Sequence, residues 1–116
     1  MTISVQFIDG LDEEISGVSL RKRRDSAINI VVLIFKNIHA IERLRAYRKQ
    51  INNLLLRDDE GDIQVTPNGV KFFFTEDESL SRVECFFEVE TESAFERVMR
   101  FLNRYAEANG FQYQST

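Results

Sequence analysis

Apolar and polar side chains alternate at the N-terminus of the chain. Over Thr2–Ile8, the apolar residues Ile3, Val5 and Phe7 share one face of an extended backbone, and polar residues take the other face. A two-residue period is typical of a half-buried strand, because successive side chains of a strand point to opposite faces. The segment is therefore predicted to be the first strand.

A stricter alternation covers Ser81–Glu90, where Phe86 alone interrupts the polar face. The residues predicted to face the core are Val83, Cys85, Phe87 and Val89. By contrast, Ile30–Phe35 is apolar at every position, which is typical of a strand covered on both faces. We predict a half-buried strand in the first case and a central strand within Ile28–Lys36 in the second.

Turn-forming residues separate two further strand segments. The sequence Asp58-Asp59-Glu60-Gly61 lies between Leu54–Arg57 and Asp62–Thr66 and predicts a β-hairpin, with glycine where a positive φ is needed. Pro67-Asn68-Gly69 predicts a second turn, which leads into a strand at Val70–Phe74. Residues 11–17, with consecutive acids, are predicted to be a solvated loop.

The clearest helix signal covers Ser93–Gly110. Ser93 and Glu96 have the spacing of a capping box, and Asn109-Gly110 favours a left-handed stop. Residues at intervals of three and four form an apolar stripe: Phe95, Val98, Met99, Leu102, Tyr105 and Ala106. The residues predicted to look outward are Glu96, Arg97, Arg100, Asn103, Arg104 and Glu107. We expect the stripe to be part of the core.

Two other segments carry shorter patterns. Within Asn37–Asn53, apolar residues recur at helical intervals, which predicts a short amphipathic helix. Its basic positions are Arg43, Arg45, Arg48 and Lys49. After the long helix, Phe111–Gln114 alternates again and predicts a short edge strand, to which Phe111 and Tyr113 belong.

The order of these elements defines the expected fold class. Strand segments occupy most of the chain, and one long amphipathic helix needs a partner for its apolar face. The 116 residues suffice for one hydrophobic core. We predict a single α+β domain over residues 1–116, with a mostly antiparallel sheet and the long C-terminal helix packed across it.

Charge and composition exclude several classes of protein. The net charge of -4 and pI near 5.0 argue against nucleic acid as a partner, because phosphate binding requires a dominant basic field. The longest apolar run has six residues, against roughly 20 for a membrane-spanning helix. A single cysteine excludes an intrachain disulfide framework and suits a reducing compartment. No targeting segment is visible at the N-terminus.

The residues that could support chemistry do not form a set. His39 and Cys85 are the single members of their type and lie on different elements, so no metal site and no cofactor is expected. Cys85 belongs to an inward-facing series and is predicted to be a buried, inert thiol. We expect no enzyme, although a small-ligand-binding or enzymatic domain with an unrecognised pocket stays open as an alternative.

The densest positive charge lies at Arg21-Lys22-Arg23-Arg24, at the end of a short strand-like segment. Such a run is usually a solvated strand end, and its functional interpretation is a docking surface for an acidic partner or an anionic lipid surface. Binding of a single-stranded nucleic acid would favour aromatic residues interleaved with the cations. The run Arg21–Arg24 contains none.

Several segments resemble the photosystem II 13-kDa assembly proteins, the Psb-twenty-eight family. The similar residues follow in the same order over nearly the whole chain: the opening Ile-x-Phe strand, Val18–Arg24, Leu56–Ile63, and Phe95–Phe111 with its Arg-Phe-Leu-Asn-Arg-Tyr core. The family usually has Trp at the position of Phe95 and Pro at the position of Ile38, so the chain resembles a divergent paralogue.

The resemblance implies a non-catalytic protein attached peripherally to the thylakoid membrane, on its cytoplasmic or stromal side. Its expected partners are the inner antenna and reaction-centre proteins of photosystem II in assembly intermediates, and it also implies a link to biogenesis of chlorophyll-binding proteins. Without a transit peptide, a cyanobacterial or plastid-encoded product is expected. In order of priority, the expected contacts are Arg21–Arg24, then the cations of residues 43–49, then Arg97, Arg100 and Arg104. The terminal edge strand is a further expected contact.

Overall fold

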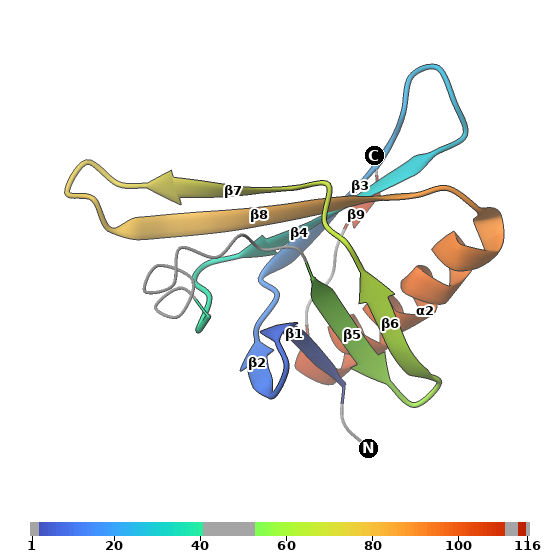
Figure 1. The fold of residues 1–116 in the computed structure, drawn as a ribbon, viewed down its shortest axis with the longest axis horizontal. Coiled ribbons are helices and arrows are strands. Elements are labelled where there is room, and N and C mark those ends of the chain that lie inside the picture. Colours follow the sequence, from blue (N-terminus) through green and yellow to red (C-terminus); the bar gives the residue numbers. More distant parts are fainter. Residues whose placement is uncertain (1–2, 41–52, 111–113, 116) are drawn as a thin grey trace.

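The computed structural model describes residues 3–40, 53–110 and 114–115. In chain order, its elements are β1 (Ser4–Ile8), β2 (Leu11–Glu13), β3 (Gly17–Lys22), β4 (Asn29–Phe35), β5 (Leu54–Asp58), β6 (Gly61–Val65), β7 (Gly69–Phe74), β8 (Leu80–Val89), α2 (Glu92–Asn109) and β9 (Gln114–Ser115). Strands and one long helix confirm the α+β class (Figure 1).

The strands form two sheets where the sequence predicts one. One sheet has the order β2-β1-β5-β6, and the other has the order β7-β8-β4-β3-β9. Every pairing is antiparallel except that of β3 with β9. The division arises because the linker after β6 carries the chain from the first sheet into the second, so that consecutive strands β6 and β7 do not pair (Figure 1).

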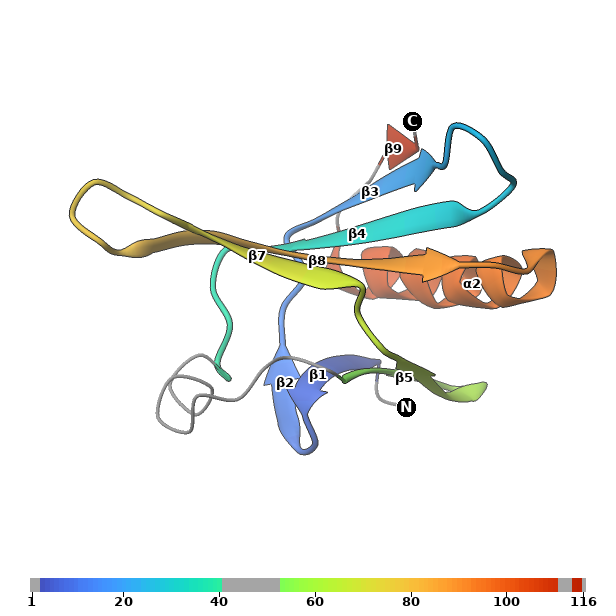
Figure 2. The same ribbon diagram turned by 45° about the horizontal axis from the view of Figure 1, so that its top comes forward.

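Helix α2 lies between the five-stranded sheet and the β5–β6 hairpin (Figure 2). Its buried residues are Val98, Phe101, Leu102 and Tyr105, while Phe95 and Met99 are partly buried against the same core. The predicted stripe is therefore the core-facing side of the helix. It omitted Phe101, whose exposed fraction is 0%. The helix supplies the apolar layer that both sheets need.

The strand predictions agree with the observed burial. Val83, Cys85, Phe87 and Val89 of β8 are all buried, as their alternation indicates. Strand β4 is central, because it pairs with β3 on one side and β8 on the other. Its second face is less covered than predicted, because Ile30 and Ile34 remain half-buried.

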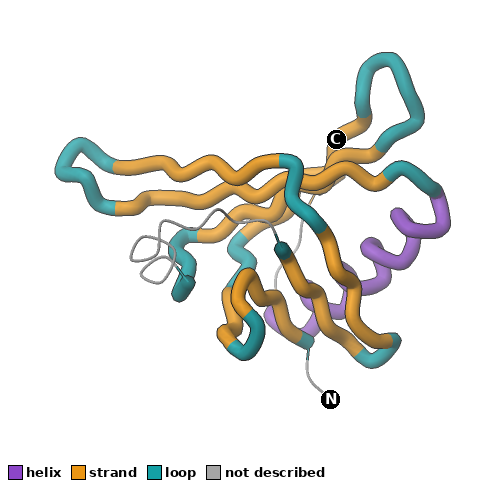
Figure 3. The backbone as a smooth tube through the Cα atoms, viewed as in Figure 1, coloured by secondary structure: helices purple, strands orange, loops and turns teal. Residues whose placement is uncertain are grey.

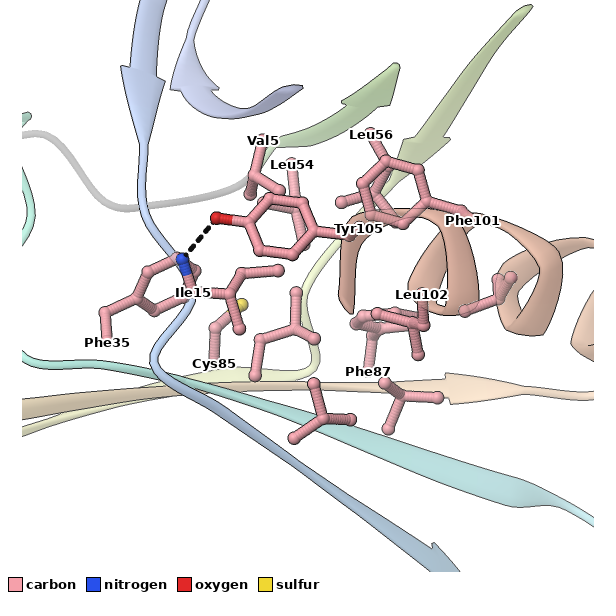
Figure 4. Close-up of a cluster of buried hydrophobic side chains, with 14 of the residues drawn as sticks. Val5, Ile15, Phe35, Leu54, Leu56, Cys85, Phe87, Phe101, Leu102 and Tyr105 are labelled. Atoms are coloured by element: carbon pink, nitrogen blue, oxygen red, sulfur yellow. Dashed lines mark hydrogen bonds between the residues drawn. The ribbon is translucent and has the colours of Figure 1, made fainter. Parts of the chain in front are cut away.

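The tyrosine hydroxyl of the helix reaches the core between the sheets. Figure 4 shows Tyr105 pointing across the cluster toward Ile15, and its Oη accepts a hydrogen bond of 2.9 Å from the backbone N–H of Ile15. That N–H belongs to the segment joining β2 to β3, and the hydrogen bond satisfies a buried donor. The contact ties the end of α2 to the connection between the two sheets.

Both helix boundaries follow local chemistry, but the start differs from the prediction. Thr91 is the N-cap, and its side chain accepts from the Ala94 backbone N–H at 3.1 Å. The capping box predicted at Ser93 is therefore wrong by two residues, since Ser93 already lies within the helix. At the other end, Gly110 has φ 69, which confirms the left-handed stop.

Residues 11–17 contain a strand where a solvated loop is predicted. Strand β2 pairs with β1, and Glu13 at its end is buried. The carboxylate accepts from the backbone N–H groups of His39 at 2.6 Å and Ala40 at 2.9 Å. Burial of this acid is tolerated because both oxygens are hydrogen-bonded. Its partners are far away in the sequence, so local composition indicates a solvated acid instead.

The C-terminal strand forms at Gln114–Ser115 and pairs in parallel with β3, opposite Ser19 and Leu20. The prediction of an edge strand over Phe111–Gln114 is thus confirmed at Gln114, and the observed strand extends one residue further, to Ser115. Phe111 and Tyr113, on which the alternation also rests, lie outside the described residues. The predicted hairpin at Asp58–Gly61 is likewise confirmed by the pairing of β5 with β6.

Candidate partner-binding surfaces

The basic run lies at one end of the five-stranded sheet. Arg21 and Lys22 end β3, and Arg23 and Arg24 enter the turn toward β4, which projects from the body in Figure 1. All four residues are exposed. Arg23 forms an ion pair of 3.1 Å with Glu88 on β8, and among the described residues the other three have no carboxylate within ion-pair distance. Three cations of the run are therefore available to an external anion.

The second predicted patch belongs to the segment 37–53. Its residues, Arg43, Arg45, Arg48 and Lys49, lie outside the described residues, as does most of the predicted helix within 37–53. Ile38 at the start of that segment is buried, and Ala40 is held by Glu13. Residues 38–40 are therefore anchored in the core.

The three helix arginines lie off the apolar stripe, as predicted, and Arg100 is exposed, but all three are paired with acids of the β5–β6 hairpin instead of standing alone in solvent. Arg97 donates to both carboxylate oxygens of Asp58, at 2.9 and 2.6 Å, and to the carbonyl of Gly61 at 3.1 Å. Arg104 bridges Asp58 and Glu60, and Arg100 donates to both oxygens of Glu60. We call these five side chains the arginine cluster. It clamps the helix onto the hairpin turn.

The arginine cluster changes the titration of its acids. Hydrogen bonds from Arg97 lower the pKa of Asp58 from 3.8 to about 2, with help from Arg104 and the Glu60 backbone N–H, against an opposing effect of burial. Hydrogen bonds from Arg100 and Arg104 lower the pKa of Glu60 from 4.5 to about 2. Both carboxylates are anions at neutral pH, so they neutralise much of the positive charge that the helix would otherwise present.

The arginine cluster also bears on the alternative of an enzymatic site. A general acid or base works best with a pKa near the operating pH, whereas Asp58 and Glu60 are shifted away from it. Two open grooves occur in the described chain, with volumes of about 370 and 420 Å³, and neither is lined by these two acids. The perturbed acids therefore give no support to catalysis.

Cys85 is buried, as its place in the alternating series predicts. Burial raises the pKa of its thiol to about 12, so it is protonated at neutral pH. Within residues 3–40, 53–110 and 114–115, no three His, Cys, Asp or Glu side chains gather as metal ligands. No helix in the described part of the chain is both long and apolar enough to cross a membrane.

Comparison with known proteins decides the family. The family model described as Psb28 protein matches residues 5–113. The chain belongs to the Psb28 family. Among its relatives, the "Photosystem II reaction center Psb28 protein" of Cyanidioschyzon merolae is 33% identical over 96% of both chains. The protein of that name from Prochlorococcus marinus (strain MIT 9211) is 33% identical over 97% of this chain and 92% of its own length.

The Psb28 match confirms the resemblance found from the basic segment, the hairpin and the helix, because residues 5–113 include all three. A Psb28 relative from Acaryochloris marina (strain MBIC 11017) is 28% identical over the full length of both chains. The sequence patterns did not reveal the part that Asp58 and Glu60 play in this member of the Psb28 family. A signal was present, because acids in a tight turn and arginines along one helix face are complementary, but nothing local indicates that they meet.

Proposed function

We propose that the protein is a non-catalytic accessory factor that binds photosystem II assembly intermediates and assists biogenesis or repair of the complex. Membership of the Psb28 family supports this, since relatives are named photosystem II reaction center proteins. The partners are core subunits, namely the inner antenna and reaction-centre proteins. The protein attaches peripherally to the thylakoid membrane, on its cytoplasmic or stromal side.

The observation that carries the proposal is the basic run Arg21–Arg24. It gathers four exposed cations at one end of a protein whose net charge is -4. A local field of sign opposite to the net charge orients a protein toward a complementary surface and speeds association. Acidic loops of a membrane-protein complex, or the anionic lipid around it, present such a surface.

A free strand edge beside the basic run supplies a second mode of contact. Strand β9 is the edge of the five-stranded sheet and pairs with Ser19 and Leu20 of β3, immediately before Arg21. An edge strand can accept an extended segment of a partner through backbone hydrogen bonds. We propose that a partner tail adds at this edge while the cations of the basic run hold the neighbouring acidic groups.

The remaining cations rank lower. Arg97, Arg100 and Arg104 keep exposed fractions of 20, 48 and 35%, but their charges are largely compensated by Asp58 and Glu60. We propose them as a third contact surface, with Arg100 as its most accessible member. The cations of residues 43–49, outside the described residues, stay the second predicted patch.

Charge reversal of the basic run tests the proposal. A full-length protein with Arg21→Glu, Lys22→Glu, Arg23→Glu and Arg24→Glu should co-purify with photosystem II intermediates about tenfold less than the wild type, because each exposed ion pair contributes up to about 1 kcal/mol. The measurement is quantitative mass spectrometry of subunits recovered with the tagged protein from thylakoids.

A matched pair of variants separates position from net charge. Arg21→Glu with Lys22→Glu, and Lys36→Glu with Lys71→Glu, each exchange two exposed cations and shift the net charge from -4 to -8, since each exchange changes it by two. The first pair should weaken recovery, and the second should leave it close to wild type. Equal recovery with all variants, given native circular dichroism, would rule out docking through the basic run.

A further inference from the structure

The β7–β8 hairpin extends past the other strands of its sheet. Strand β4 pairs with β8 only from Val83 onward, whereas β7 continues to pair with β8 as far as Phe74 and Leu80. Residues 72–83 therefore form an arm that is two-stranded beyond the Phe72–Val83 pair and that projects away from the helix and the four-stranded sheet in Figures 2 and 3. The arm points away from the end that carries the basic run.

The inner face of the arm is apolar and open. Phe72 and Phe74 lie two residues apart on β7 and so share a face, and Phe72 pairs with the buried Val83. That face is a continuation of the core. Beyond the core its side chains are uncovered, because Phe72 is 37% exposed and Phe74 is 55% exposed. These are the large hydrophobic side chains of the described chain that are exposed, and both lie here.

On the outer face of the arm, the aromatic rings are covered by cationic side chains. The guanidinium of Arg82 lies 4.1 Å from the ring centroid of Phe73, and the Lys71 ammonium lies 5.8 Å from that of Phe86. Cations at these distances are attracted to the ring face and shield it from water. The outer face is therefore covered by side chains of the hairpin itself, and the inner face offers the accessible apolar surface.

The tip of the arm carries negative charge in a defined turn. Glu76, Asp77 and Glu78 are all exposed. The backbone N–H of Thr75 donates to the carbonyl of Ser79 at 2.8 Å, and the Glu78 N–H donates to the carbonyl of Thr75 at 3.0 Å. The Thr75 hydroxyl also contacts Asp77. The backbone of the acidic turn that follows Phe74 is therefore held by hydrogen bonds.

We propose that the inner face of the arm binds a basic amphipathic segment of a partner protein. Apolar side chains of that segment pack on Phe72 and Phe74, and its Lys or Arg residues face Glu76 and Glu78. Charge complementarity selects this occupant, because an anionic lipid surface or a nucleic acid would be repelled by the acidic tip. The contact lies opposite the basic run, so one protein can hold two surfaces of opposite charge.

Purified full-length protein and synthetic peptides test the contact without photosystem II. A designed amphipathic Leu/Lys peptide should bind in fluorescence anisotropy, and its Leu/Glu counterpart should not. Phe72→Ser with Phe74→Ser should weaken binding by about tenfold or more, since an apolar contact of two aromatic anchors is lost. Glu76→Lys with Glu78→Lys should weaken it comparably, whereas the Arg21–Arg24 reversal should have little effect.

The same assay can overturn the proposal. Equal binding of both peptides, or unchanged binding by the phenylalanine variant with native circular dichroism, would contradict it. A photo-reactive phenylalanine analogue at position 74 then identifies the occupant in thylakoids. Thylakoids are used as the source of the partner because of the proposed function. Cross-links to a basic amphipathic segment of another protein support the inference. Cross-links to residues 41–52 of the same chain, or to lipid alone, oppose it.

Discussion

Asp58 illustrates how a single residue holds the four-stranded sheet and the helix together. Its side chain is fully buried and accepts hydrogen bonds from Arg97 and Arg104, both on α2. Its pKa falls from 3.8 to about 2 in the folded protein. A lowered carboxylate pKa stabilises the fold above the unfolded value of 3.8, and this stabilisation is lost as the pH falls toward about 2.

Asp58→Asn should reduce the free energy of unfolding by about 2.5 kcal/mol at pH 7, because lowering a pKa from 3.8 to about 2 stabilises the folded protein by about that amount. The difference from wild type should shrink between pH 4 and pH 2, where wild-type Asp58 itself becomes protonated. Urea denaturation across this range provides the measurement. Asp59→Asn, an exposed neighbour in the same turn, is the control and should be nearly neutral. A constant difference down to pH 2 would contradict the assignment.

At the scale of elements, tertiary position decides where a helix begins. Thr91 and Ser93 are both good N-cap residues, and the Ser93–Glu96 spacing favours the second. In the structure, Thr91 has extended backbone angles, φ -115 and ψ 151, and is separated from the end of β8 by Glu90 alone. Pairing of β8 with β4 holds the chain extended up to Val89. Thr91 is the first good N-cap residue after this point, and the helix therefore begins there, two residues before Ser93.

Thr91→Ala should therefore destabilise the protein by about 1 kcal/mol, because the Ala94 N–H loses its side-chain acceptor. Ser93→Ala should change stability by less than about 0.5 kcal/mol, as expected for an exposed helix position. Thermal or urea unfolding of the two variants compares them directly. A larger loss of stability with Ser93→Ala than with Thr91→Ala would contradict the assignment of Thr91 as the N-cap.

On the scale of the whole molecule, the five-stranded sheet has ends of opposite charge. The turn after β3 carries the basic run, and the tip of the arm carries Glu76, Asp77 and Glu78 (Figure 1). The terminal strand β9 adds a free edge at the basic end. Positive charge and the free edge of β9 therefore lie together beside β3, as the proposed docking mode requires.

Truncation after Gly110 tests the edge. The shortened protein should keep its fold, because β9 contributes two residue pairs to the sheet and the core residues lie before Gly110. It should recover fewer photosystem II subunits than the full-length protein, because the strand that receives the partner is gone. Undiminished recovery would refute strand addition at β9 while leaving the basic run as a separate contact.

The sequence by itself determined the features that depend on neighbouring residues. The alternation of β8, the apolar run of β4, the hairpin turn at Gly61 and the left-handed stop at Gly110 follow from side-chain period and backbone preference, and all are observed. The family could also be recognised from the sequence, because the similar residues lie in short local segments that follow one another in the same order.

Only the tertiary structure decided what depends on residues far apart in the chain. Asp58 and Arg97 are 39 positions apart, and Glu13 and His39 are 26 apart. Whether such side chains are solvated or paired depends on how the chain crosses between sheets, which no local period encodes. The division into two sheets, the compensation of the helix arginines and the uncovered inner face of the arm all arise from that crossing, because burial and ion pairing depend on distance in space.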